Sequence, residues 1–152
     1  MATVRWIGQA PKVAQVDTLT VGGTIEVGDK FKVTINGKTV STSATTTSTT
    51  TTATEIATTL NALTAANGYP EFAEITFAGV AATVTCTADN AGRPFTLTVT
   101  TTESDDTAAD LQTFVRAATT ASAGPNHWDT ATNWDTGIVP VSTDTVIFDR
   151  GS

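Results

Sequence analysis

The sequence contains one histidine and one cysteine, two residue types that often act as general base or nucleophile. His127 lies between Asn126 and Trp128, and no G-x-S-x-G or H-E-x-x-H pattern surrounds it. Cys86 lies in the alternating stretch 82–87, where a small buried side chain on a strand is expected. A single cysteine excludes a disulfide within the chain and a zinc cluster built from thiolates. We therefore predict a structural or exposed histidine, a buried thiol and no enzymatic activity.

Two groups of aspartates could supply oxygen ligands to calcium. Neither group matches the D-x-[DN]-x-[DN]-G loop, so solvated loop carboxylates are the favoured interpretation. The pair Gly22-Gly23 indicates a turn and lacks the G-x-x-x-x-G-K-[ST] pattern of a phosphate-binding loop. No metal and no cofactor is therefore expected. The aspartates are Asp105, Asp106 and Asp110 in one group, and Asp129, Asp135 and Asp144 in the other.

The chain is acidic and poor in charge, with a formal net charge of −7, a pI near 4.4 and 15% charged residues. Binding to nucleic acid or to an anionic membrane needs clustered Lys and Arg, and the basic residues here are scattered. Neither is an expected partner. No stretch reaches transmembrane length, and the first residues lack the pattern of a signal peptide. Synthesis in the cytoplasm, with no export signal, is therefore expected.

Threonine makes up roughly a quarter of the chain, several times its usual share. Its β-branched side chain suits strands, and its hydroxyl keeps an exposed strand face wet without adding charge. Many short strands are expected. The first are residues 13–21 and 24–27, followed by a hairpin in which Asn36-Gly37 joins 31–35 to 38–43, because this pair tolerates the positive φ angles of a type I′ turn.

One helix is predicted over residues 53–66, because Ile56, Leu60 and Leu63 recur at helical spacing. Thr52 and Glu55 have the spacing of a capping box, and Asn67-Gly68 followed by Pro70 supplies a stop. The preceding Thr/Ser run at 45–52 is interpreted as a loop or a polar edge strand.

Strands return after the helix. Phe72, Ile75 and Phe77 begin one, and 82–88 and 95–101 alternate apolar with polar residues and are predicted to form a second hairpin. Residues 102–110 are expected to form a loop. Leu111, Phe114 and Val115 indicate a short strand or a helical turn.

These elements predict a mainly β (α+β) fold, a small antiparallel β-sandwich of two hairpin units with one packed helix. We divide the chain into an N-terminal arm at 1–12, a β-rich domain at 13–122 and a tryptophan-containing C-terminal tail at 123–152. The tail contains the break Gly124-Pro125 and a β-type apolar stretch at 145–148.

Two resemblances add to this interpretation. Residues 13–101, with GDKFKVTING at 28–37, the helix at 55–63 and GRPFTL at 92–97, resemble a module of bacteriophage virion proteins; similar units occur in bacterial filament and surface proteins. The tail, NHWDTATNWDTGIVP at 126–140 followed by DTVIF at 144–148, is similar to the opening of right-handed β-helix repeats in phage fibres and adhesins. In those relatives further strands follow, because a single rung cannot bury its apolar face alone.

The resemblances imply a virion structural protein, either a capsid cement or decoration protein or the anchoring domain of a head fibre. Its expected partners are the major capsid protein or another virion protein, together with further copies of itself, and its expected location is the virion. A tail-fibre or tailspike adaptor is one alternative. A bacterial surface or filament subunit, or a carbohydrate-binding module, is another, which would need an export route.

The two ends of the chain carry all three tryptophans and are predicted to make most contacts with neighbouring subunits. The tail tryptophans could also form a platform for sugar rings, although a plug at the end of a β-core is the favoured interpretation. The candidate interface residues are Trp6, Ile7, Trp128, Trp134, Val146 and Phe148.

Overall fold

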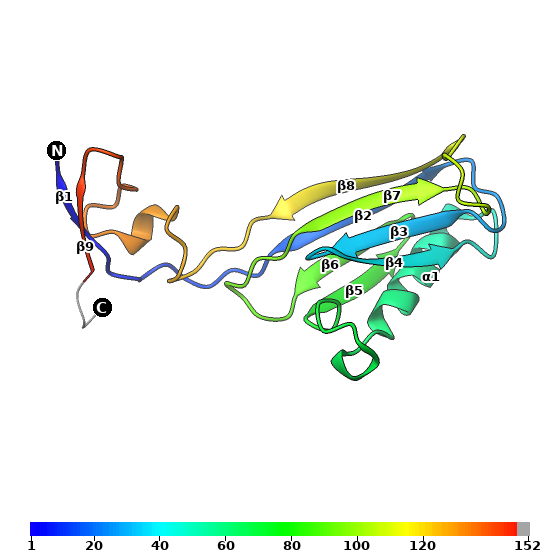
Figure 1. Ribbon diagram of the computed structural model, residues 1–152, viewed down its shortest axis with the longest axis horizontal. Helices are drawn as coiled ribbons and strands as arrows, with labels where there is room; N and C mark the ends of the chain where they lie inside the picture. The colour runs from blue at the N-terminus through cyan, green and yellow to red at the C-terminus, as the bar shows by residue number, and fades with distance from the viewer. Residues whose placement is uncertain (149–152) are drawn as a thin grey trace.

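The computed structural model describes residues 1–148 and shows an elongated molecule with a lobe at each end (Figure 1). The large lobe, residues 13–122, contains most of the strands and the α-helix. The small lobe combines residues 1–12 with residues 123–148. Residues 149–152, the last part of the predicted tail, lie outside the described residues. The expected separation of arm and tail is thus replaced by a shared lobe.

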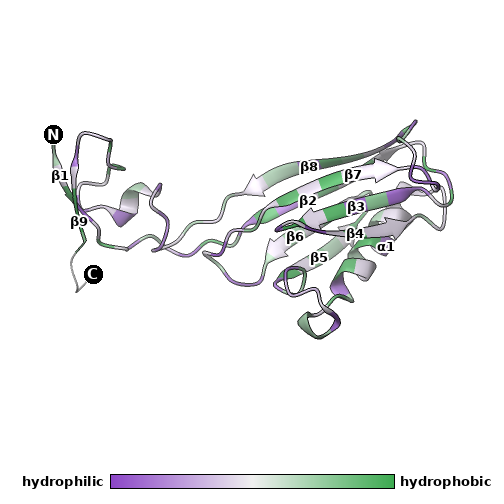
Figure 2. Cartoon of the chain, viewed as in Figure 1, coloured by the Kyte–Doolittle hydropathy of each residue, from purple (hydrophilic) through white to green (hydrophobic). Residues whose placement is uncertain are grey.

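The large lobe is a sandwich of two antiparallel sheets, which confirms the predicted fold class. One sheet has the order β5-β6-β2-β8 and the other β4-β3-β7. Figure 2 shows apolar and polar residues interleaved along these strands, as a sheet with one buried face requires. The strands are β2 (Val16–Gly23), β3 (Lys30–Ile35), β4 (Lys38–Ser43), β5 (Ile75–Val80), β6 (Thr83–Ala88), β7 (Leu97–Thr102) and β8 (Gln112–Thr120).

The hairpin of β3 and β4 is confirmed. Asn36 and Gly37 join the strands with φ angles of 48° and 86°, the left-handed values of a type I′ turn. Along β3, Phe31, Val33 and Ile35 point into the core and are at most 1% exposed. The alternation read from the sequence therefore corresponds to the two faces of this strand.

The second predicted hairpin is wrong. Strand β6 pairs with β5 and β2, whereas β7 pairs with β3 in the opposite sheet. The connection at 89–96 is too long to fix a tight turn, and it crosses from one sheet to the other. Gln15 holds this crossing in place, because its side chain donates to Phe95 O (2.9 Å) and accepts from Phe95 N (3.0 Å).

The helix begins and ends earlier than predicted, as α1 (Thr49–Asn61). Ser48 caps it, with its hydroxyl accepting from Thr51 N, so the proposed capping box at Thr52 is wrong and part of the Thr/Ser run is helical. A separate 3₁₀ turn (Ala65–Asn67) follows and ends at Gly68, whose φ is 90°. The predicted stop at Asn67-Gly68 is present, but it ends this 3₁₀ turn and not α1.

Helix α1 packs at the side of the sandwich, against the outer strand β5. Asn61 bonds both main-chain groups of Phe77, donating to its O (2.7 Å) and accepting from its N (3.0 Å). The side chain therefore covers a strand edge that would otherwise stay open. Ile56 and Leu60 are buried as predicted, while Leu63 is only partly buried against the core.

Two strand predictions need correction. Residues 24–27 form no strand, and the short element predicted around Phe114 is the nine-residue strand β8. Its partner β2 begins three residues later than predicted, at Val16. The predicted loop at 102–110 is present, with Asp106 at a φ of 67°.

The small lobe joins segments from opposite ends of the sequence. Strand β1 (Thr3–Arg5) lies parallel to β9 (Thr145–Ile147), with Val4 opposite Val146. A two-stranded parallel sheet is unusual, because parallel strands normally lie inside larger sheets covered on both faces. Other contacts must therefore hold this lobe together.

Candidate interaction site

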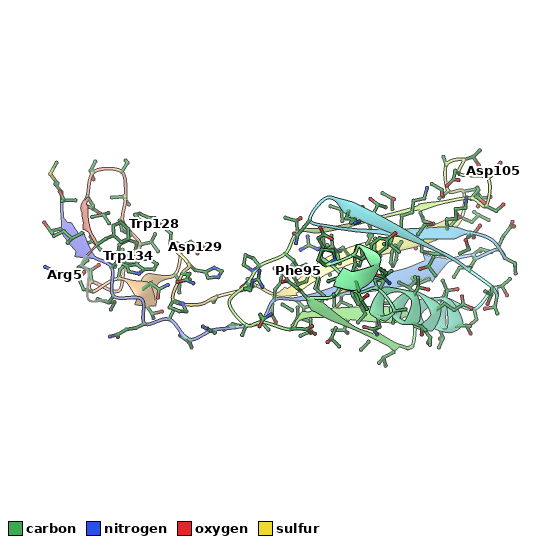
Figure 3. All side chains as sticks on the ribbon, turned by 60° about the horizontal axis from the view of Figure 1, so that its bottom comes forward. Arg5, Phe95, Asp105, Trp128, Asp129 and Trp134 are labelled. Carbon is green, nitrogen blue, oxygen red and sulfur yellow. The ribbon has the colours of Figure 1, made fainter. Side chains whose placement is uncertain are left out.

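Four aromatic rings form the centre of the small lobe. Trp134 is 1% exposed and lies edge-on to Trp6 and Trp128, with ring centroids 4.8 Å and 4.6 Å away. Its indole N–H donates to the carbonyl oxygen of Trp128 (2.9 Å). Phe148 closes the cluster at 5.9–6.3 Å from the three indole rings. Figure 3 shows Trp128 and Trp134 side by side in this lobe.

The structure divides the six candidate interface residues into three groups. Trp134 is a core residue, so the expectation that it faces a neighbouring molecule is wrong. Trp6, Ile7 and Val146 are partly buried. Trp128 and Phe148 keep 47% and 63% of their surface exposed, and they form the apolar surface of the cluster.

Asn133 holds the chain segments of the small lobe together, a role that sequence reasoning missed. Its side chain is fully buried, accepts from Ala10 N (2.8 Å), and donates to Gly124 O and His127 O (2.8 Å each). The amide thus joins the N-terminal segment at Ala10 to the turn that contains Gly124 and His127. An isolated Asn in a loop gave no signal of this burial.

Two of the aspartates considered as calcium ligands instead bind backbone N–H groups. Asp135 accepts from Arg5 N (2.9 Å), and Asp144 accepts from Ala2 N (2.9 Å) and Val141 N (3.1 Å). The bond from Ala2 is the main reason that the pKa of Asp144 is lowered. Within residues 1–148 no group of three or more His, Cys, Asp or Glu side chains is placed to hold a metal ion.

His127 connects the small lobe to the large one. Its Nε2 lies 3.1 Å from the carbonyl oxygen of Gly92 and 3.5 Å from the hydroxyl of Ser122, while Nδ1 lies 4.0 Å from Asp129. A carbonyl oxygen can only accept, so Nε2 carries the proton in this contact. The histidine thus fixes the junction between the lobes.

A groove of about 410 Å³ opens beside this junction, lined by the ends of β2 and β8 and by His127 and Asp129. At its wall the fully buried Asp17 pairs with Arg116 (2.7 Å) and accepts from Gln15 (2.7 Å). Both carboxylate oxygens are therefore engaged.

The remaining candidates also have structural partners. Cys86 is buried as expected, and burial, with a smaller contribution from Asp17, raises the pKa of its thiol to about 12. At the far end of the large lobe Asp106 bonds Lys30 (2.6 Å) and Lys32 (2.8 Å), which lower its pKa to about 2. Figure 3 places the neighbouring Asp105 at the end opposite the tryptophans.

The fold and this site define an α+β sandwich with an aromatic lobe attached through two chain segments. No known family model matches the chain, and a search of curated proteins found no significant match. Among residues 1–148 no helix is both long and apolar enough to cross a membrane.

Proposed function

We propose that this chain is a non-enzymatic structural protein of a bacteriophage particle, either a capsid cement or decoration protein or the anchoring domain of a head fibre. The observation that carries the proposal is the position of the half-exposed aromatic cluster, on a small lobe at one end of an elongated molecule (Figure 1). Such a surface suits attachment, because aromatic residues dominate the energetics of protein interfaces.

The large lobe supports the proposal through its surface. The outward-facing residues of the four-stranded sheet include Thr18, Thr20 and Thr85, which are polar but uncharged. A hydroxyl-rich face tolerates permanent contact with water and binds nucleic acid poorly. The sandwich would thus project from the particle while the small lobe attaches it to the capsid or to another virion protein.

The contacts of the chemically competent side chains also support a non-enzymatic role. His127 bonds a backbone carbonyl, Asp17 is paired, and the Cys86 thiol is buried with a raised pKa. A general base or nucleophile needs a free group within reach of a substrate.

A carbohydrate-binding module is the second candidate. It is favoured by Trp128, whose ring stacks on Trp6 at an interplanar angle of 22° and remains 47% exposed. Sugar rings stack on such indoles. Saturable binding of oligosaccharides, abolished by Trp128→Ala, would favour this role over the virion.

The direct test is mass spectrometry of particles purified from the organism that encodes this chain. We expect the chain in stoichiometric amount relative to the major capsid protein, and recovery only from the cell or the medium would contradict the proposal. Purified protein should also bind particles that lack it. In that assay Trp128→Ala should weaken binding at least tenfold. Val115→Ala, at a somewhat more exposed site on the large lobe (58% against 47% for Trp128), should leave binding unchanged.

A further inference from the structure

Strand β9 has an open edge. Thr145 N donates to Ala2 O (2.8 Å) and Trp6 N donates to Ile147 O (3.0 Å). Main-chain groups alternate between the two sides of a strand, so the N–H and C=O of Val146 point away from β1. In the part of the chain that the structure describes, the sheet contains only β1 and β9. A further strand could therefore pair with Val146 without displacing a hydrogen bond within residues 1–148.

The outer edge of β1 is closed at Arg5. Arg5 N donates to the carboxylate of Asp135 (2.9 Å), and Asp135 N donates to Arg5 O (3.0 Å). A side chain and a turn therefore occupy the positions that another strand would need. The small sheet can grow on one side only.

The open edge continues the aromatic cluster. Val146 is in register with Val4, which is 3% exposed, so both side chains lie on the same face of the sheet. Phe148, two residues further, lies on that face and packs against the tryptophans, yet 63% of it is exposed. A strand added to β9 would lie beside Phe148, at the margin of this apolar surface.

We propose that β9 pairs edge to edge with β9 of a second copy of this chain, antiparallel and centred on Val146. The two Val146 residues then exchange both of their main-chain hydrogen bonds, and the two small sheets become one four-stranded sheet. The closed edge of β1 limits the assembly to two copies. The biological purpose of this dimer rests on the assembly role proposed above. Its geometry depends on β9 alone.

Charge favours a second copy as the partner. The segment from Thr145 to Phe148 contains no charged side chain, although the chain carries a net charge of −7. Pairing about a two-fold axis through Val146 sets residues 145–147 against the same residues of the other copy and Phe148 against Asp144, so no like charges meet across the strands. Two acidic molecules can therefore approach each other at this edge.

Shape also favours the two-fold arrangement. A register centred on residue 146 sets Phe148 of one copy opposite Asp144 of the other. Asp144 lines a hollow of about 170 Å³ with apolar walls that include Val4 and Ile138. Ile138 is 68% exposed at this hollow. Phe148 thus lies beside an apolar recess of the second copy, and both positions become buried.

Sedimentation velocity from about 1 to 200 micromolar tests the association. The paired strands are short, so we expect a reversible dimer with a dissociation constant on the order of 10 micromolar. Val146→Pro removes only the outward N–H and should raise this constant at least about tenfold. Thr145→Pro serves as the comparison, because it removes the N–H that bonds Ala2 O and should disorder the lobe itself. Unchanged tryptophan fluorescence in Val146→Pro shows that its lobe is folded.

Cross-linking tests the register. Paired Cα atoms at the two-fold axis lie within disulfide range, so Val146→Cys should form a disulfide-linked dimer under mild oxidation. Val141→Cys places a thiol at an exposed position of the same lobe (62%), away from the axis, and should cross-link at least tenfold more slowly. Equal rates, or a monomer at 200 micromolar, would overturn the dimer. Either result would leave the particle proposal standing, whereas absence from particles would refute that proposal alone.

Discussion

Different interactions stabilise the interior of each lobe. The large lobe surrounds one continuous core of aliphatic and aromatic side chains, and long antiparallel ladders satisfy its backbone. The small lobe has three-residue strands, a half-exposed aromatic cluster and side chains that bond the backbone in place of neighbouring strands. The sandwich thus buries its core within one lobe, whereas the small lobe leaves part of its aromatic cluster exposed.

The difference bears on the assembly role that we propose for this protein. The core of the large lobe is closed, and the outer faces of its sheets include many threonines. Trp128 and Phe148 leave apolar surface exposed. Contacts that bury this surface would gain about 25 cal/mol of free energy per Å². Under the proposed assembly role, the small lobe is therefore the part that would contact a partner.

Truncation of the large core should have the largest effect. Leu60 is 1% exposed on α1, so Leu60→Ala should lower the free energy of unfolding by about 2 to 5 kcal/mol. Leu63, which is only partly buried, is the matched control and should cost less than half as much when truncated. Urea denaturation followed by circular dichroism measures both. Equal losses would contradict the placement of the helix ends.

Removal of the Asn133 side chain should affect the small lobe alone. Asn133→Ala leaves Ala10 N, Gly124 O and His127 O without their buried partner. We expect a loss of about 2 to 3 kcal/mol for this lobe, with the circular dichroism transition of the sandwich unchanged. Thermal melts monitored by both signals test this, and a matching fall in the sandwich transition would show that the lobes unfold as one.

Substitution of Gly37 should destabilise the β3–β4 turn through backbone strain and not through a steric clash. Gly37 has a φ of 86° and nothing within 4 Å of an added Cβ. Gly37→Val should therefore cost at least about 1 kcal/mol, while Gly37→Asn should cost less, since Asn tolerates left-handed backbone. An unchanged melting temperature for Gly37→Val would contradict the turn assignment.

Protonation of Asp144 at low pH should destabilise the small lobe. Backbone bonds lower its folded pKa below the unfolded value, so its contribution is full above about pH 4 and is lost as the pH falls through the folded pKa. Tryptophan fluorescence between about pH 6 and pH 2 should report this change. Asp144→Asn should remove the pH dependence, and an identical profile in the variant would assign the transition to another carboxylate.

The sequence predicted local structure better than long-range pairing. Asn36-Gly37 specifies its own turn, and the alternation of Phe31, Val33 and Ile35 specifies two faces of a strand, so both were readable. The partner strand of β7 could not be predicted, because the sequence of the loop that precedes β7 does not indicate which sheet the chain enters. The aromatic residues of the site could be identified from the sequence by type. The role of Asn133 could not, since it joins Ala10 to Gly124 across most of the chain.

We expect the small lobe to be a separate and less stable unit, and its tryptophans make this measurable. All three lie in the small lobe, so tryptophan fluorescence reports on this lobe and far-ultraviolet circular dichroism mainly on the sandwich. Urea titrations at about 1 micromolar, below the expected dimerisation, should give a lower midpoint by fluorescence than by circular dichroism. If the two midpoints coincide, and the free energy of unfolding has the same slope against urea by both signals, the lobes form one cooperative unit and the small lobe is not a separate one.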